Sequence, residues 1–292
     1  MPGPDREPWL VLGGTGQLGV ALATRLRRAG HRFHLPSRGE LDLSDPARIP
    51  SALGRMAPAV VLNAAAFTDV AAAEAPEVAD EVFHLNRDAP QALARACRAM
   101  GIPLVHISTD YVFDGASSLP YREDDPTRPL QVYGRSKLEG ERAVLSNHPR
   151  ALVVRTSTLF GPAERMKANY VDAILRRARR ARLLEVVEFP VSCPTFAPDL
   201  AGAILALLED AVTGIVHVVN RGHCSRLELA RAVIEEAGLG ESVEIRTRPA
   251  PPGDVPRPAY SVLETSRYDS IVGAPLRSWR EAVREHVRSQ AP

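Results

Sequence analysis

The feature that most constrains the fold is a glycine-rich turn that joins an apolar run to an amphipathic segment near the N-terminus. The run WLVLGG, residues 9–14, is short and stopped by glycine, which is typical of a buried parallel strand. The next segment repeats leucine at Leu18, Leu22 and Leu26 and ends at Gly30, a common helix stop. These residues predict a strand, a tight turn and a helix, in that order.

The same alternation continues along the chain. Apolar runs at 31–37, 58–66, 102–109 and 150–160 predict strands, and the patterns at 86–100 and 136–146 predict helices. Strands that alternate with helices form parallel βαβ units. The predicted fold class is α/β, a doubly wound parallel Rossmann-type sheet with a smaller C-terminal lobe. Beyond residue 160 we expect helices near 200–211, 225–238 and 279–287, a strand at 214–220, and an extended proline-rich loop at 246–261.

Composition excludes several classes of partner. The 36 basic and 35 acidic residues nearly cancel, so no global charge favours nucleic acid or an anionic membrane. No apolar run reaches the roughly 18 residues that a membrane-spanning helix needs, and no apolar signal core opens the chain. Cys97, Cys193 and Cys224 are too scattered for a disulfide framework or a zinc cluster. We expect a soluble cytoplasmic protein.

The glycine turn itself indicates a binding site. Gly13, Gly16 and Gly19 stand at three-residue spacing directly after the first predicted strand. Glycine there lets the backbone approach a pyrophosphate, whose charge is favourable at a helix N-terminus. The alternative is a purely structural tight turn. The spacing is the one seen in extended short-chain dehydrogenases, so we expect a nicotinamide dinucleotide.

The segment after the second predicted strand bears on which dinucleotide binds. Ser37 and Arg38 fall where the adenosine ribose lies, and an arginine there can pair with a 2′-phosphate. NADPH is therefore favoured over NADH, although a solvated surface arginine is the alternative. Asp42 is placed to accept a hydrogen bond from the adenine amine, or else to cap its own loop.

A tyrosine and a lysine suggest the chemistry. Tyr133 and Lys137 are four residues apart in a stretch that runs into the helix predicted at 136–146, and on a helix residues at this spacing share one face. An ammonium near a phenol lowers the phenol pKa and lets the tyrosine act as an acid. The alternative is two polar side chains on a solvated face. Ser108 and Thr109 end the preceding strand at the edge where ligands bind, so the combination predicts a dehydrogenase site with a hydroxyl beside the tyrosine.

These segments resemble one family. LGGTGQLG, LDLSD, VVLNAAAFTDVAAAE, VHISTDYVFDG, PYREDDPTRPLQVYGRSKLEGE and RPAYSVLETS are similar to dTDP-4-dehydrorhamnose reductase, an extended short-chain dehydrogenase, over nearly the whole chain. The resemblance implies hydride transfer from NADPH or NADH to the C4 ketone of a nucleotide-linked 4-keto-6-deoxysugar. It implies that Thr109 bonds the sugar, Tyr133 protonates the ketone oxygen, and Lys137 holds the nicotinamide ribose.

The resemblance also assigns the remaining site residues, with Asn86 ordering the active-site strands. The expected cofactor-binding residues are Gly13, Thr15, Gly16, Gln17, Leu18, Gly19, Ser37, Arg38, Asp42, Leu43, Asn63, Ala64, Ala65, Ala66, Ser108, Tyr133 and Lys137. The expected substrate-binding residues are Thr68, Thr109, Asp110, Tyr111, Thr158 and Arg257. No metal is expected, although some relatives bind magnesium at a dimer contact and Glu281 and Glu285 are the local acidic candidates.

Four departures from the family pattern fall on the substrate side. Thr158 and Arg226 replace tryptophans, Ala71 replaces an aspartate, and residues 188–195, EFPVSCPT, lack the usual glutamine and glycine. Two alternatives therefore stay open: a related ketoreductase or epimerase that acts on a different sugar, and a non-catalytic NAD(P)-binding regulatory subunit like the β subunit of methionine adenosyltransferase.

The expected organisation follows from these assignments. Residues 1–160 should form mainly the NAD(P)-binding Rossmann domain and residues 161–292 mainly the substrate-binding lobe, with some chain exchange between them. The expected partner is a nucleotide-sugar substrate, a homodimer is left open, and neither nucleic acid nor a membrane is expected.

Overall fold

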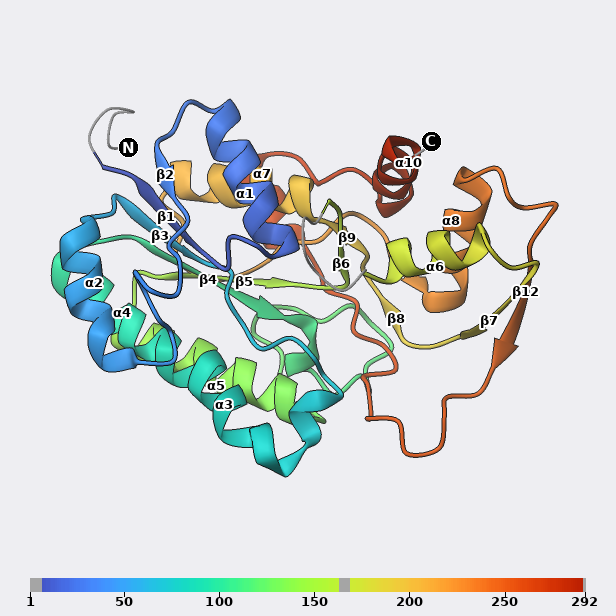
Figure 1. Cartoon of the computed structure of the whole chain (residues 1–292), viewed down its shortest axis with the longest axis horizontal. Coiled ribbons are helices and arrows are strands. Elements are labelled where there is room, and N and C mark those ends of the chain that lie inside the picture. The colour runs from blue at the N-terminus through green and yellow to red at the C-terminus, as the bar shows by residue number, and fades with distance from the viewer. Residues whose placement is uncertain (1–6, 163–168, 291–292) are drawn as a thin grey trace.

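The computed structural model describes residues 7–162 and 169–290, which are built around one parallel sheet (Figure 1). Its six strands lie in the order β10-β5-β4-β3-β1-β2, and every neighbouring pair is parallel. The strands are β1 Trp9–Leu12, β2 Phe33–His34, β3 Val60–Asn63, β4 Leu104–Thr109, β5 Leu152–Thr156 and β10 Gly214–His217. Because parallel strands end at the same edge, their carboxyl ends gather the loops that follow them.

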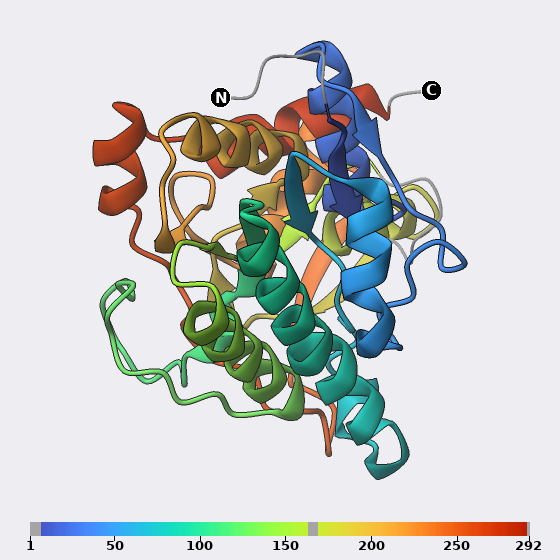
Figure 2. The ribbon, with the colours of Figure 1, turned by 90° about the vertical axis from the view of Figure 1, so that its left-hand side faces the viewer.

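Helices cover both faces of the sheet, which is why its strands are mostly apolar, with polar residues concentrated toward their carboxyl ends. Alternate residues of β1 point to opposite faces: Trp9 and Val11 join one core, and Leu10 and Leu12 join the other. The first core contains the predicted leucine stripe of α1, which packs beside α7, and the second contains residues of α2, α4 and α5 (Figures 1 and 2). These helices are α1 Gln17–Arg28, α2 Ile49–Met56, α4 Ala89–Met100, α5 Val132–Asn147 and α7 Ala197–Glu209.

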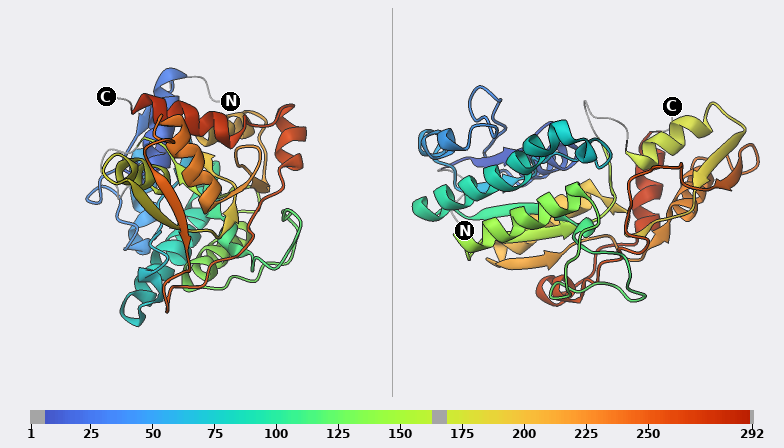
Figure 3. Two further views of the ribbon diagram at one scale, coloured as in Figure 1. Left: turned by 90° about the vertical axis from the view of Figure 1, so that its right-hand side faces the viewer. Right: turned by 90° about the horizontal axis from the view of Figure 1, so that it is seen from below.

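A smaller lobe lies beyond the carboxyl edge of the sheet and has its own core (Figure 3). It is built from α6 Tyr170–Ala178, α8 Arg226–Glu236 and α10 Trp279–Ser289 around the parallel pair β7 Leu183–Val187 and β12 Glu244–Arg248. Two further strand pairs, β8 Val191–Ser192 with β11 Cys224–Ser225 and β6 Leu159–Phe160 with β9 Thr195–Phe196, lie between lobe and sheet. The short helices α3 Ala79–Phe83 and α9 Ser266–Val272 complete the fold.

Three local expectations differ from the structure. The single strand expected at 150–160 is two strands, because Thr158 has a φ of 36° and breaks the extended run. The loop expected at 246–261 begins inside a strand, since residues 246–248 pair with β7, where no proline interrupts the ladder. The helix expected from residue 86 begins with a π-helical turn, His84–Asp88, before α4.

The C-terminal half of the chain contributes to both parts of the molecule. Strand β10 extends the large sheet beside β5, and α7 packs on α1. Within residues 7–162 and 169–290, no helix is both long and apolar enough to cross a bilayer.

Candidate functional site

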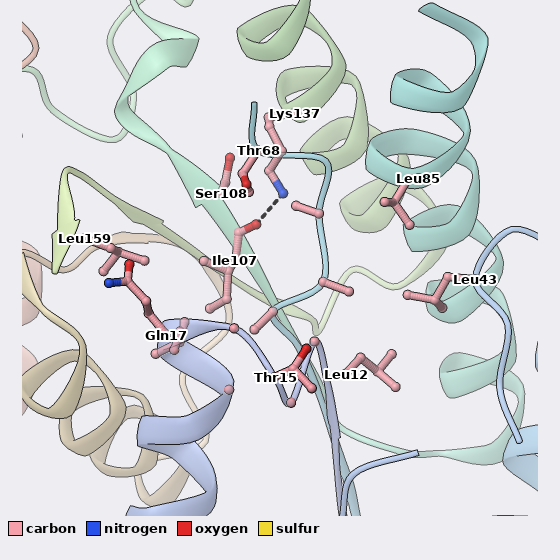
Figure 4. A pocket seen from close by; sticks show the side chains of 18 of the residues that line it. Leu12, Thr15, Gln17, Leu43, Thr68, Leu85, Ile107, Ser108, Lys137 and Leu159 are labelled. Atoms are coloured by element: carbon pink, nitrogen blue, oxygen red, sulfur yellow. Dashed lines mark hydrogen bonds between the residues drawn. The ribbon is translucent and has the colours of Figure 1, made fainter. Parts of the chain in front are cut away.

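A cavity of about 1020 Å³ opens at the carboxyl edge of the sheet (Figure 4). The strand order changes direction between β1 and β3, and this is where open α/β sheets bind ligands. The register places Leu12 beside Asn63 and Thr109 beside Thr156, so β1 ends level with β3 and β4 ends level with β5. Asn63 pairs with His106, so β4 and β5 run farther than β1 and β3 at this edge. The residues that follow β1, β3, β4 and β5 therefore line one continuous cavity.

Most of the predicted site residues line this cavity. They are Gly13, Thr15, Gly16, Gln17, Leu18, Gly19, Ser37, Arg38, Asp42, Leu43, Ala64, Ala65, Ala66, Thr68, Ser108, Thr109, Asp110, Tyr133, Lys137 and Thr158. Asn63, Tyr111 and Arg257 do not line it. The fold thus brings the glycine turn and the Tyr133–Lys137 pair, more than a hundred residues apart in sequence, onto the same cavity.

The glycine turn is packed so tightly that Gly13 and Gly19 leave no room for a side chain. Gly13 has a φ of +75°, and a Cβ added to it would lie 2.8 Å from the carbonyl carbon of Ala64. A Cβ on Gly19 would lie 2.2 Å from the carbonyl oxygen of Gly13. Gly16 begins α1 without a side-chain cap, and the first turn carries no acidic residue. The Gly16 N–H donates to the carbonyl oxygen of Gly13 at 2.9 Å, but the first N–H groups of α1 itself are available to an anion, which fits the pyrophosphate of a dinucleotide.

The loop after β2 forms the other end of the cavity. Arg38 is exposed there, and Ser37 donates from its backbone N–H and its hydroxyl to Oε2 of Glu40, each at 2.8 Å. Asp42 accepts from the backbone N–H of Ser44 at 2.8 Å and from its hydroxyl at 2.7 Å through Oδ1. Asp42 therefore caps its own loop, which was one of the two readings of this residue.

Helix α5 carries Tyr133 and Lys137 on one face, as their spacing predicts. Lys137 is buried, and its Nζ donates a hydrogen bond of 2.6 Å to the carbonyl oxygen of Ile107 in β4 (Figure 4). Burial lowers the pKa of Lys137 to about 8, against the opposing effect of the Glu141 carboxylate. The amine is thus fixed between helix and strand, at the wall of the cavity.

The expectation that Lys137 lowers the Tyr133 pKa is wrong for this structure. Burial raises the pKa of Tyr133 well above its ordinary value, and a hydrogen bond with the Thr109 side chain only partly offsets that effect. Desolvation disfavours the phenolate, and the lysine amine is engaged with Ile107. Tyr133 is therefore a neutral phenol that holds its proton, the form that a general acid needs before it donates.

Asp110 lies in a cage of hydroxyls that the sequence did not reveal. Its Oδ2 accepts from Ser157 at 2.7 Å and from Ser261 at 2.5 Å, and its Oδ1 accepts from Thr109 at 3.1 Å. Burial raises the pKa of Asp110 to about 6 despite these hydrogen bonds. The serines are distant in sequence from Asp110, and the only sequence signal was the hydroxyl-rich ST pair that follows Thr156. The cage fixes the Thr109 hydroxyl at the cavity.

Asn86 connects the loop after β3 to helix α5, rather than one active-site strand to another. Its side chain exchanges hydrogen bonds with the backbone of Phe67, at 2.8 and 3.1 Å, and donates to the Ser136 hydroxyl at 2.9 Å. Asn63 has a similar supporting role: its Nδ2 lies 3.1 Å from Nδ1 of His106, and its Oδ1 accepts from the backbone of Ala65. Both amides position the loop after β3.

Two of the departures from the family pattern meet in space. The hydroxyls of Thr158 and Ser192 are 2.8 Å apart, and Thr158 holds a φ of 36°, which a β-branched residue rarely adopts. On the same side of the site, the ring of Tyr111 meets that of Tyr133 edge-on, with 6.1 Å between centroids. Tyr111 therefore lies next to the predicted acid, although it does not line the cavity.

The acidic residues considered for magnesium are otherwise engaged. Glu281 caps α10 by accepting from the backbone and hydroxyl of Ser278, and Glu285 pairs with Arg277. In the described part of the chain, no group of three or more His, Cys, Asp or Glu residues is arranged to hold a metal ion.

Comparison with known proteins agrees with this geometry. The family model described as RmlD substrate binding domain matches residues 8–291. A dTDP-4-dehydrorhamnose reductase of Mycobacterium tuberculosis is 38% identical, over 95% of this chain and 91% of that protein. A probable dTDP-4,6-dihydroxy-2-methyloxan-3-one 4-ketoreductase of Streptomyces antibioticus is 39% identical, over 95% and 93%.

The fold agrees as well. The crystal structure of a dTDP-4-dehydrorhamnose reductase from Bacillus anthracis, in complex with NADP, superimposes with a TM-score of 0.90 at 27% identity, over 98% of this chain and 100% of that one. The predicted Rossmann-type fold class and the predicted resemblance are both confirmed. The chain belongs to the dTDP-4-dehydrorhamnose reductase family of NAD(P)H-dependent oxidoreductases.

Proposed function

We propose that the protein reduces the C4 ketone of a dTDP-linked 4-keto-6-deoxysugar, with dTDP-4-dehydrorhamnose as substrate, dTDP-rhamnose as product and NADPH as reductant. The observation that carries this proposal is the single cavity that joins the glycine turn to Tyr133, Lys137 and Thr109. A dinucleotide cradle and a proton donor on one cavity are what ketone reduction requires.

Each residue then has a defined task. NADPH supplies the hydride. The N–H groups at the start of α1 hold its pyrophosphate, and Lys137, anchored on Ile107, holds the nicotinamide ribose. Thr109, whose hydroxyl donates to Asp110 in the structure, turns that proton toward the ketone oxygen, and Tyr133 gives the same oxygen its proton as negative charge develops there.

The test is absorbance decay of NADPH with dTDP-4-dehydrorhamnose, measured for the parent protein and for Tyr133→Phe. Removal of a general acid costs about 10²–10⁴-fold in kcat, and the variant should still bind NADPH. Tyr121→Phe is a matched control, because Tyr121 bonds Asp114 outside the cavity. If the parent protein binds NADPH but does not oxidise it when any keto-sugar nucleotide is added, the proposal is overturned in favour of a non-catalytic subunit.

A second candidate is the same chemistry on another dTDP-sugar. The hydroxyl pair of Thr158, which lines the cavity, and Ser192 of β8 behind it favours this candidate, because small polar groups replace a tryptophan and a glycine of the family pattern. Parallel assays with 4-keto-6-deoxysugars that differ in ring configuration, with NMR of the products, separate the two candidates. The substrate with the highest kcat/KM identifies the sugar.

A further inference from the structure

Two arginines of the smaller lobe lie close together without an acidic partner. Arg226 is the first residue of α8, and Arg257 lies in the segment between β12 and α9. Neither makes an ion pair with any residue of 7–162 or 169–290, and Nε of Arg257 is buried without a hydrogen-bond partner. Buried donors are normally satisfied, so this nitrogen needs an explanation.

Arg226 is held rigidly by its surroundings. Its backbone N–H donates to the carbonyl oxygen of Glu188 at 3.0 Å, and its own carbonyl accepts from the Tyr170 hydroxyl at 3.0 Å. The guanidinium lies over the Tyr170 ring, 5.3 Å from its centroid. The preceding residue, Ser225, closes a capping box with Glu228, which fixes the start of the helix. The cation is therefore preorganised, and little side-chain entropy remains to be lost on binding.

The two guanidiniums act on each other and on Tyr111. Burial lowers the pKa of Arg226, and the charge of Arg257 lowers it further, so the two cations are near enough to repel. Burial raises the pKa of Tyr111, and the charges of Arg257 and Arg226 both oppose that rise, so both guanidiniums lie near the phenol. The charge of Asp254 opposes this lowering of the Arg226 pKa, but Asp254 is exposed, and its carboxylate accepts a hydrogen bond from the backbone of Val255. Two like charges held together without an ion pair among the described residues favour the binding of an anion.

We propose that Arg226 and Arg257 together bind the diphosphate of the nucleotide-sugar substrate, with Arg226 as a diphosphate-binding residue to which the family resemblance assigns no role. This inference rests on the proposed function. A diphosphate offers two charges and several acceptor oxygens, and each guanidinium presents a planar fork that can bond them in pairs. The N-terminus of α8 adds favourable potential at the same place.

The position of the pair suits a sugar whose ketone meets Tyr133. Tyr111 connects the arginines to the acid: the charges of both arginines act on its phenol, and its ring meets the Tyr133 ring edge-on, with 6.1 Å between centroids. A hexose that places its C4 oxygen at Tyr133 would direct its C1 substituent past Tyr111. The anionic linkage at C1 would then arrive at Arg226 and Arg257.

Calorimetric titration of the full chain tests this assignment, with NADP⁺ present at saturation so that the cofactor part of the cavity is filled. The probes are dTDP, UDP and GDP, with thymidine as the uncharged comparison. Arg226→Gln should weaken binding of the preferred diphosphate by about 10- to 100-fold, the range of a charge-assisted hydrogen bond, and leave thymidine unaffected. The diphosphate affinity of Arg226→Lys should lie between those of the parent and Arg226→Gln, because lysine keeps the positive charge and loses the planar fork of donors.

Arg280→Gln is the matched control. Arg280 stacks on Trp279 of α10, with 4.7 Å to the ring centroid, and carries the same charge on a neighbouring helix. An equal loss of diphosphate affinity in Arg280→Gln and Arg226→Gln would overturn the inference, because only general electrostatics would be at work. It would also be overturned by unchanged diphosphate affinity in a folded Arg226→Gln variant, or by a parent protein that binds none of the three diphosphates.

The outcome is separable from that of the proposed function. Diphosphate binding that depends on Arg226, in a protein that reduces no keto-sugar, supports this inference and contradicts the reductase. Reduction of the keto-sugar with the same KM in the parent and in Arg226→Gln supports the reductase and contradicts this inference.

Discussion

Arg155 holds the carboxylate of Glu141 by two parallel hydrogen bonds beneath the candidate catalytic helix, Nε to Oε1 at 2.9 Å and Nη2 to Oε2 at 2.8 Å. Both side chains are almost fully buried, with 3% and 2% exposed. Oε1 also accepts from the Ser108 hydroxyl at 2.5 Å. Glu141 lies one turn after Lys137 on α5, so this ion pair ties the helix of the predicted acid to β4 and β5.

Glu141→Gln should be strongly destabilising. Loss of one partner from a buried pair leaves an uncompensated charge, which typically costs about 3–5 kcal/mol. Glu139→Gln on the same helix is the control, because its pair with Arg87 is 42% and 40% exposed and should contribute less than about 1 kcal/mol. Urea unfolding at neutral pH measures both. Equal losses in the two variants would show that the Glu141 pair does not hold the fold.

The burial of Lys137 predicts a pH-dependent stability. Its pKa is lowered to about 8 from 10.5, so the unfolded chain binds more protons than the folded one between these values. Stability therefore rises with pH across this window, and below pH 8 the buried charge is a constant cost. Relative to Lys137→Met, the parent should gain up to about 3 kcal/mol between pH 8 and pH 10.5, at roughly 1.4 kcal/mol per pKa unit.

Paired urea titrations of the parent and Lys137→Met at several pH values measure this difference, and the other titrating groups cancel in the comparison. A difference that stays constant or falls as pH rises would mean that the lysine is not buried as a cation. Loss of turnover in Lys137→Met, with normal folding, would separate its task in the reaction from its effect on stability.

Gly19→Ala should disrupt the cofactor cradle. Helix propensity alone predicts that alanine would raise the free energy of unfolding by about 1 kcal/mol. The added Cβ, however, would lie 2.2 Å from the carbonyl oxygen of Gly13, and a backbone atom cannot rotate away from it. Overpacking of this kind typically costs about 1–3 kcal/mol. The affinity for NADPH, measured by fluorescence, should fall together with the stability. Gly240→Ala is the control, since a Cβ there meets nothing within 4 Å.

What the sequence could predict here depended on local spacing. The leucine stripe of α1, the Tyr133–Lys137 face and the strand that ends at Thr109 are set by residues near one another in the chain, and all three are present. The hydroxyl cage of Asp110 brings together residues up to 151 apart, which no spacing rule could find. The Tyr133 pKa was mispredicted because burial, a property of the folded chain, outweighs a neighbouring charge.

The choice between NADPH and NADH should depend on two adjacent side chains of opposite charge. Arg38 is exposed and makes no ion pair with residues 7–162 or 169–290, so it can meet a 2′-phosphate. The Glu40 carboxylate accepts hydrogen bonds from the N–H and hydroxyl of Ser37, each at 2.8 Å. Hydrogen bonds from Ser37 lower the pKa of Glu40, so it is ionised at neutral pH and opposes an incoming phosphate.

Arg38→Ala should therefore weaken the binding of NADPH by about 10- to 100-fold and leave the binding of NADH nearly unchanged. Glu40→Gln should act in the opposite direction and strengthen the binding of NADPH by up to about fivefold, the scale of an exposed charge interaction. Titration of each variant with both cofactors gives the two affinity ratios. If Arg38→Ala alters neither cofactor, Arg38 is a solvated surface residue. If Arg38→Ala lowers the affinity for NADPH and the affinity for NADH equally, the arginine contacts the adenosine rather than the 2′-phosphate.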